Sequence, residues 1–215
     1  PFMILDGEKS FGLFIDYPSE IIFDIGFTHK DYIKITIFSK DLDIYLFECD
    51  EKLTIIKEYF ALTGKPYIPP KWAFGFQQSR WSYFSEEEVR YVANKYRELD
   101  IPLDVIYTDI DYMDGYKVFT IHRETFPNYE GMVKDLAQKG IKVIPIIDPG
   151  VKIEEGYHVY EEGKMNKYFC VDKNREDFVA AVWPGLTHFP DFLNSDVRKW
   201  WGRQYKIFTD MGIKG

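Results

Sequence analysis

Three aspartates, Asp109, Asp111 and Asp114, follow an apolar run at residues 103–108. The run has the length and composition of a buried parallel strand, which places these acids where the chain leaves the sheet. An unpaired carboxylate is costly to bury, and ligands of α/β folds bind at the carboxyl ends of the strands. We therefore expect at least one of the three aspartates to face a substrate, a cation or an arginine.

Aromatic side chains make up 18% of the chain, and several occur in segments that also carry acids. Flat aromatic rings pack against the apolar faces of sugars, and carboxylates accept hydrogen bonds from sugar hydroxyls. A carbohydrate site needs both kinds of group, so this combination favours one. The aromatic residues in question are Trp81, Tyr83, Tyr112, Tyr116, Trp183 and Phe189.

Charge and hydropathy narrow the class of partner. The net charge of −8 argues against a nucleic-acid or anionic-membrane partner, since both need a basic face. No window approaches eighteen uninterrupted apolar residues, and the first residues lack the pattern of a signal peptide, so we expect a globular cytoplasmic protein. Cys49 and Cys170 have neither paired spacing nor a histidine cluster, which indicates no disulfide framework and no zinc site. A homo-oligomer is compatible with this sequence.

The first part of the chain has the pattern of β-structure. Its predicted strands are rich in β-branched residues and span residues 21–26, 32–38 and 42–47. Three strands alone would leave an open edge and a bare apolar face, so residues 1–52 are interpreted as the C-terminal part of an antiparallel β-sandwich. Residues 53–70 then predict a helix and a proline-rich linker, which we take as the domain boundary.

From residue 71 onward, strand and helix patterns alternate. Strands are expected at residues 72–77, at the acid-tipped run and at residues 141–147, where Pro145 predicts a bulge or local break. Helices are expected after Ser85, which begins a capping box with Glu88, and after Asn128. A third helix is expected to begin with Ser195 as its cap.

Residues 148–195 are too many for an ordinary loop, so they predict an insertion with short structure at residues 168–171 and 180–183. Residues 71–215 thus fit a partial (β/α)₈ TIM barrel, with three βα units and a long insertion after the third strand. A doubly wound sheet fits the same alternation. The lack of a glycine-rich phosphate loop after these strands weighs against a nucleotide-binding version of it.

Five motifs, in this order, resemble glycoside hydrolase family 31, and the match covers roughly residues 60–215. They are Arg80-Trp81-Ser82-Tyr83, the run from Ile101 to Asp114, Phe126-Pro127, Ile146 to Gly150, and Val182 to Gly185 with Phe189 to Phe192. Residues 1–50 lie where that family has its N-terminal β-sandwich. The resemblance implies a (β/α)₈ catalytic barrel that hydrolyses α-glycosides with retention and needs no metal or organic cofactor.

The resemblance also implies that no residue of this chain is catalytic. Retention uses two carboxyl groups, a nucleophile and an acid/base, on opposite sides of the glycosidic bond. The family nucleophile is the aspartate of a Trp-x-Asp-Met-Asn-Glu strand that follows a glycine-containing segment, and residues 212–215 match only that preceding segment. The acid/base lies further along the chain than the nucleophile in this family, so we expect both carboxylates to lie outside this sequence.

Sugar-binding residues do carry over. Asp109 matches the aspartate that bonds sugar hydroxyls in the −1 subsite, with a structural partner for an arginine as the alternative. Trp81 and Trp183 match aromatic residues that form walls of the sugar pocket. Ile147, or its neighbour Ile146, matches the residue that forms the apolar floor. The alternative for these residues is a role in the hydrophobic core alone. The residues expected to support them, by holding loops or ordering the catalytic strand, are Arg80, Asp111, Asp148 and Asp191.

The leading hypothesis is a parent α-glucosidase that acts on α-glucoside oligosaccharides. Family members acting on α-xylosides usually lack the Asp-Ile-Asp-Tyr-Met-Asp and Trp-Pro-Gly motifs, which favours glucosides. The alternatives are an α-xylosidase or α-glucan lyase of the same family, or a non-catalytic carbohydrate-binding protein on the same scaffold. A further alternative is an unrelated barrel enzyme in which Asp109 and Asp111 bind a divalent cation.

Overall fold

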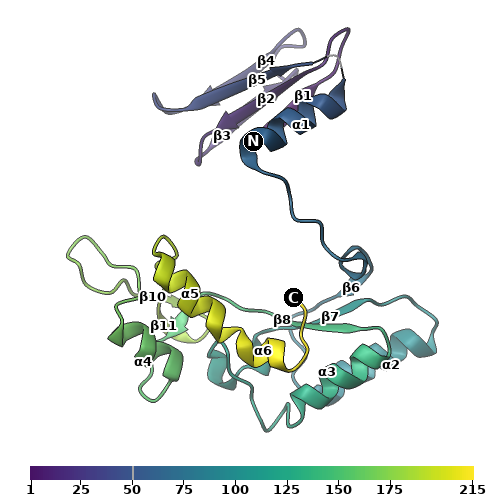
Figure 1. Cartoon of the computed structure of the whole chain (residues 1–215), viewed down its shortest axis with the longest axis vertical. Helices are drawn as coiled ribbons and strands as arrows, with labels where there is room; N and C mark the ends of the chain where they lie inside the picture. The colour runs from purple at the N-terminus through teal and green to yellow at the C-terminus, as the bar shows by residue number, and fades with distance from the viewer. Residues whose placement is uncertain (50) are drawn as a thin grey trace. The chain divides into compact units, whose positions relative to one another are not determined.

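The computed structural model describes residues 1–49 and 51–215 (Figure 1). These residues form two compact units, Pro1–Ile68 and Pro69–Gly215. The division falls inside the segment 53–70 that the sequence suggested as a boundary. None of the helices in this described part of the chain has the length and apolar character needed to cross a membrane.

The first unit is antiparallel. One sheet has the order β1-β2-β5, and a hairpin of β3 and β4 forms the other. The bounds are Phe2–Leu5 for β1, Phe11–Asp16 for β2, Ile21–Ile25 for β3, Ile33–Ile37 for β4 and Asp43–Glu48 for β5. The last three correspond to predicted strands, while β1 and β2 had been missed.

Helix α1 (Lys52–Thr63) belongs with the first unit rather than with a separate linker. It packs on β2 and β5, and its Ile55 is fully buried. The Ile55 side chain lies directly over Gly12 of β2, in the space where any larger residue would place its Cβ. Burial of the apolar side of α1 therefore fixes the helix to the sheet, and the proline-rich stretch begins only after it.

The second unit contains a parallel sheet of order β6-β7-β8. Its strands are Gln77–Gln78, Val105–Thr108 and Lys142–Pro145, and β7 lies in the middle with Val105 and Ile106 fully buried. The predicted strand at 72–77 was largely wrong. Pro70 instead begins a 3₁₀ turn, η1 (Lys71–Phe74), because its carbonyl accepts a hydrogen bond from the Ala73 amide at 2.9 Å.

Two helices connect the three parallel strands, and both begin at the predicted caps. Helix α2 (Glu86–Glu98) has the Ser85 hydroxyl accepting from the Glu88 amide at 3.2 Å, and α3 (Tyr129–Gln138) has Asn128 Oδ1 accepting from the Gly131 amide at 3.1 Å. After α3, β8 ends at Pro145, which fits the predicted break because proline lacks an amide donor.

The segment after β8 has a small antiparallel sheet of its own, in the order β10-β11-β9. Its elements are β9 (Val151–Lys152), α4 (His158–Met165), β10 (Ala180–Val182) and β11 (Gly185–His188). Residues 168–171 form only two isolated bridges, Phe169 with Pro190 and Val171 with Asp177. Helices α5 (Ser195–Gln204) and α6 (Lys206–Asp210) follow, and Asn194 rather than Ser195 caps α5, because its Oδ1 accepts from the Asp196 amide.

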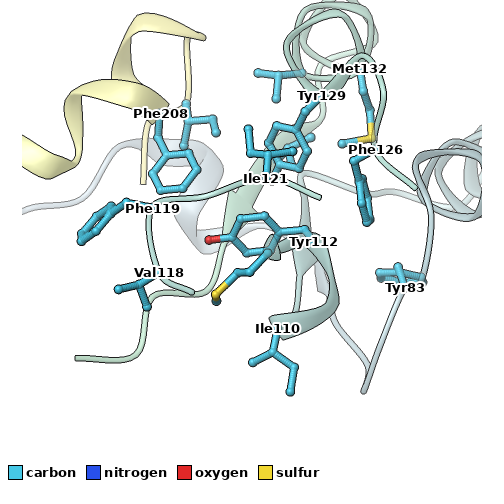
Figure 2. Close-up of a cluster of buried hydrophobic side chains, with 14 of the residues drawn as sticks. Tyr83, Ile110, Tyr112, Val118, Phe119, Ile121, Phe126, Tyr129, Met132 and Phe208 are labelled. Carbon is cyan, nitrogen blue, oxygen red and sulfur yellow. The ribbon is translucent and has the colours of Figure 1, made fainter. Parts of the chain in front are cut away.

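Tyr112 lies at the centre of the buried cluster of the second unit (Figure 2). It is in η2 (Ile110–Tyr112), the 3₁₀ turn after β7, and is fully buried. Its ring packs on Tyr129 of α3 at a centroid distance of 5.6 Å and on Phe208 of α6 at 6.1 Å. The core therefore anchors the loop that follows β7 to helices from later parts of the chain.

Candidate functional site

A cavity of about 500 Å³ lies at the carboxyl ends of β6, β7 and β8. This volume falls within the roughly 300–1,000 Å³ typical of small-molecule sites. The cavity is lined by Ser79, Arg80, Trp81, Tyr107, Thr108, Asp109, Pro145 and Ile146. The parallel sheet therefore brings Asp109, Trp81 and Arg80 of the predicted site together.

Asp109 is the acid of this cavity. It ends β7 and caps η2, and its Oδ1 accepts a hydrogen bond from the Ile110 amide at 2.8 Å. Its Oδ2 accepts no hydrogen bond from any described residue, and no described arginine forms an ion pair with it. Arg80, also in the cavity, instead lies 3.7 Å from Glu88 through its Nη1. One oxygen of Asp109 is thus fixed by the backbone while the other is free for a ligand.

Trp81 and Tyr107 supply the aromatic surface. Trp81 is 77% exposed, so it is not a core residue of this chain. The Tyr107 hydroxyl donates to Gln77 Oε1, and the Gln77 side-chain amide donates in turn to the Ala73 carbonyl at 2.7 Å. Tyr107 is therefore held in place, while the indole of Trp81 keeps a large free face toward solvent.

The two isoleucines after β8 line different cavities. Ile146 is in the cavity of Asp109, whereas Ile147 lines a separate, larger one of about 650 Å³ together with Tyr205 and Phe208. Neighbouring side chains of an extended segment point to opposite sides, so only one of the pair can face Asp109. Of the two isoleucines named for the apolar floor, the structure thus places Ile146, and not Ile147, in the lining of the Asp109 cavity. The larger cavity has no carboxylate in its lining and offers less to a hydroxylated ligand.

Trp183 is not part of the Asp109 cavity in this chain. It lies in the turn between β10 and β11 and is 65% exposed. The supporting aspartates are also spread out. Asp191 Oδ1 accepts from the Leu193 amide at 3.1 Å and so holds its own turn, Asp111 receives one long hydrogen bond of 3.4 Å from Tyr116, and Asp148 is half-buried.

Tyr112 and Tyr129 hold two residues of the cavity wall through hydrogen bonds. The Tyr112 hydroxyl donates to the Ile146 carbonyl at 2.9 Å, and the Tyr129 hydroxyl bonds Thr108 Oγ1 at 2.7 Å. Burial raises the pKa of both phenols above its ordinary value, so they stay neutral. Sequence reasoning had grouped Tyr112 with sugar-facing aromatics, but it joins the segment carrying Asp109 to the one carrying Ile146.

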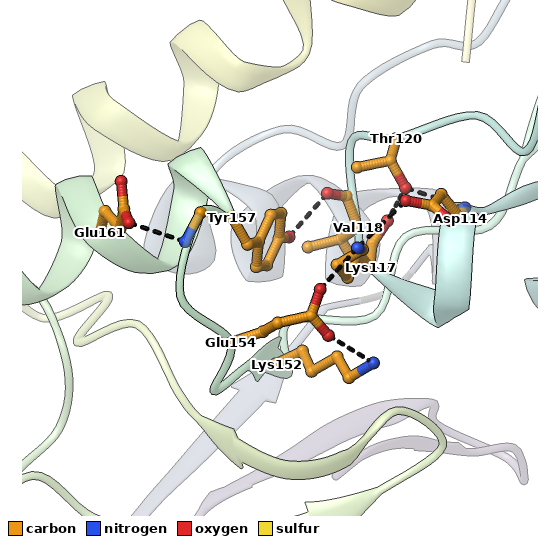
Figure 3. A network of polar contacts seen from close by, with 9 residues as sticks. Asp114, Lys117, Val118, Thr120, Lys152, Glu154, Tyr157 and Glu161 are labelled. Carbon is orange, nitrogen blue, oxygen red and sulfur yellow. Dashed lines mark hydrogen bonds and ion pairs between the residues drawn. The ribbon is translucent and has the colours of Figure 1, made fainter.

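Asp114 belongs to an ion-pair network rather than to the cavity (Figure 3). Lys117 Nζ lies 3.0 Å from Asp114 and 2.7 Å from Glu154, and Lys152 Nζ lies 2.8 Å from Glu154. The hydrogen bonds and charges of the two lysines lower the pKa of Glu154 to about 2. In addition, the Tyr157 hydroxyl donates to the Val118 carbonyl at 2.7 Å. These contacts join the segment after β9 to η3 (Asp114–Tyr116) and to the residues that follow η3.

The cavity offers a free carboxylate oxygen, an exposed indole face and an apolar side chain. This set matches a sugar ring, because its hydroxyls donate to a carboxylate and its C–H faces pack on aromatic and apolar surfaces. Within residues 1–49 and 51–215 no three His, Cys, Asp or Glu side chains gather in a way that could hold a metal ion.

Residues 66–215 match the family model described as the glycosyl hydrolases family 31 TIM-barrel domain. Among curated proteins, "Alpha-glucosidase 2" of Bacillus thermoamyloliquefaciens is 44% identical over all of this chain and 27% of its own length. The "Alpha-glucosidase" of Saccharolobus solfataricus is 34% identical over 99% of this chain and 30% of its own length. The chain thus spans less than a third of the length of these relatives.

Solved structures of family 31 enzymes are also similar to this chain. A family 31 alpha-glucosidase from Bacteroides thetaiotaomicron matches with a TM-score of 0.82 at 33% identity, over 96% of this chain and 35% of its own. A family 31 dextranase from Flavobacterium johnsoniae, in a mutant form complexed with isomaltotriose, matches with a TM-score of 0.82 at 31% identity, over 95% of this chain and 25% of its own.

Proposed function

The chain belongs to glycoside hydrolase family 31. We propose that it is part of a retaining α-glucosidase, which releases terminal α-linked glucose from oligosaccharides. Relatives named as alpha-glucosidases, which match nearly the whole chain, support this activity. The chain's own part in the reaction is to bind the sugar in the −1 subsite.

The geometry of Asp109 is the observation that carries the proposal. Its free Oδ2 stands at the carboxyl end of β7 in a cavity shared with Trp81 and Ile146. An ionised acceptor contributes roughly 1.5–3 kcal/mol per hydrogen bond, so two sugar hydroxyls on Asp109 would supply much of the affinity for one ring. The exposed indole of Trp81 and the side chain of Ile146 cover the apolar parts of that ring.

We assign the rest of the architecture accordingly. Strands β6, β7 and β8 are the first three strands of a (β/α)₈ barrel, with the segment from β9 to β11 as an insertion after the third. The antiparallel strands of the first unit are the C-terminal part of an N-terminal β-sandwich. The turn that carries Trp183 then forms a further wall of the completed sugar pocket.

The chemical step itself falls to residues outside this chain. A retaining enzyme uses two carboxyl groups about 5–5.5 Å apart, one as nucleophile and one as acid/base. Asp109 bonds hydroxyls instead, and its hydrogen bonds strengthen as the ring flattens toward the oxocarbenium-like transition state. Part of its binding energy therefore appears in turnover.

Product analysis of the full-length protein tests this function. With an aryl α-glucoside, early proton NMR spectra should show α-glucose before mutarotation, and added chelator should leave the rate unchanged. Initial β-glucose would contradict retention, and a product without an anomeric hydroxyl would indicate the lyase. An aryl α-xyloside serves as the control substrate, and faster turnover of it than of the glucoside would overturn the glucosidase assignment.

A further inference from the structure

A second cavity, of about 380 Å³, opens in the same two loops that wall the Asp109 cavity. It is lined by Phe84, Asp111, Met113, Gly115, Tyr116, His122 and Thr125. Phe84 follows Trp81 by three residues in the loop after β6, and Asp111 follows Asp109 by two in the loop after β7. None of these residues lines the Asp109 cavity.

Two aromatic side chains of this cavity are open to solvent. Phe84 is 56% exposed and Tyr116 is 38% exposed, so neither ring is part of the core. The Phe84 backbone is fixed nevertheless, because its amide donates to Glu88 Oε2 at 2.9 Å. The rings therefore stand at defined places with faces that no described residue covers completely.

Two polar side chains complement the rings. The carboxylate of Asp111 forms no ion pair with any described residue, and its one hydrogen bond is the long contact from Tyr116. His122 Nδ1 lies 2.9 Å from Thr125 Oγ1 and 3.4 Å from the Thr125 amide nitrogen, so this nitrogen is engaged within its own loop, whereas Nε2 has no hydrogen-bond partner among the described residues. The cavity thus contains a carboxylate acceptor and an imidazole nitrogen beside two aromatic surfaces.

The walls are held from behind by the core of the second unit. Met113, on the cavity wall, is buried together with its neighbours Tyr112 and Phe119. The His122 amide donates to the Tyr112 carbonyl at 2.8 Å, and the Phe126 amide donates to the His122 carbonyl at 2.9 Å. A cavity with walls fixed in this way needs little ordering when a ligand binds, which favours affinity.

The chemistry of the lining selects one class of ligand. Asp111 repels anions, and Asp111 with His122 gives two metal ligands where protein sites for zinc use three or four. A neutral ring with several hydroxyls satisfies the carboxylate, the imidazole and the aromatic faces together, because a hydroxyl can both donate and accept a hydrogen bond. We propose that this cavity is a second saccharide-binding site, which holds a hexopyranose unit of an α-glucan outside the reaction pocket.

The saccharide class named here rests on the proposed function, but binding can be measured without turnover. Asp109→Asn in the full-length protein weakens the reaction pocket, and isothermal titration with maltoheptaose then reports the remaining affinity. Adding Phe84→Ala should weaken it by roughly fivefold or more through loss of the stacking face, whereas Phe84→Tyr, which keeps that face, should not. Tyr91→Ala is the matched control, since Tyr91 is 60% exposed and lines neither cavity.

Kinetic measurements on the Phe84→Ala enzyme with Asp109 intact distinguish the claim of a second site from the claim of α-glucosidase activity. Phe84→Ala should leave kcat and KM for an aryl α-glucoside unchanged, because that substrate fills only the reaction pocket. Equal maltoheptaose affinity with and without Phe84→Ala, or no binding at all in the Asp109→Asn protein, would overturn the second site while leaving the glucosidase assignment intact. If maltoheptaose binding depends on Phe84 but the protein has no α-glucosidase activity, the second site is supported and the glucosidase assignment is overturned.

Discussion

The hydrogen bond from Tyr112 to Ile146 gives a prediction that links fold to site. Tyr112→Phe removes one hydroxyl from a fully buried ring and leaves the rest of the packing unchanged. The lost bond, of 2.9 Å, joins the segment after Asp109 to the residue that lines the other side of the cavity. We expect the variant to lose both stability and alignment of the two walls.

The size of both losses follows from the contact. Loss of a partly buried hydrogen bond costs about 0.5–1.5 kcal/mol, while a cavity term is absent because the ring remains. A loss of about 1 kcal/mol lowers Tm by about 2–4 °C in a domain of 150–250 residues. Because misplacement of a binding group lowers turnover, kcat/KM should fall by about tenfold.

Melting curves and kinetics per folded molecule on the full-length enzyme test this expectation. Tyr157→Phe is the matched control, since it removes a buried hydrogen bond of a tyrosine hydroxyl to a backbone carbonyl, that of Val118, and neither residue lines the Asp109 cavity. The control should lose similar stability with kcat/KM intact. If Tyr112→Phe and Tyr157→Phe behave alike in kinetics, the Tyr112 hydroxyl only stabilises the fold and the reasoning fails.

Trp81→Ala and Trp183→Ala should each weaken sugar binding and turnover while leaving Tm nearly unchanged, because both indoles are mostly exposed; a lower Tm with normal kinetics of the folded fraction would instead mean a core role. Glu154→Gln should lower Tm at neutral pH, where the ionised carboxylate bonds Lys117 and Lys152. The pKa of Glu154 is depressed from 4.5 to about 2 in the fold, so its stabilisation is complete above about pH 4.5 and is lost as the pH falls toward 2. The Tm difference between the native protein and the variant should close over that interval, and a difference that persists at pH 2 would contradict the ion-pair account.

Local signals made part of the fold predictable. The side chains of Ser85 and Asn128 each cap the first turn of the helix that they precede, so both helix starts could be predicted from local sequence. Strand β7 could be predicted because it is a short run of apolar residues. Strand β6 has only two residues, and its place depends on pairing with β7. Helix α4 begins without a side-chain cap, which left no start signal to read.

The site shows the same limit. Asp109 and Trp81 could be chosen from their motifs, but the choice between Ile146 and Ile147 depends on how the chain leaves β8, and that is set by pairing with β7. Tyr112 is buried only because α3 and α6 close over the 3₁₀ turn that carries it. Contacts between segments far apart in sequence decide such cases, and no short pattern records them.

The role of Asp109 is tested most directly by Asp109→Asn in the full-length enzyme, assayed with an activated aryl α-glucoside with and without azide. The variant keeps the shape of the side chain but loses the charged acceptor, so kcat/KM should fall roughly a hundredfold or more with the fold intact. Azide should not restore activity, because the missing carboxylate binds hydroxyls and never reached the anomeric carbon. Recovery of turnover with a glycosyl azide product would contradict this and make Asp109 the nucleophile.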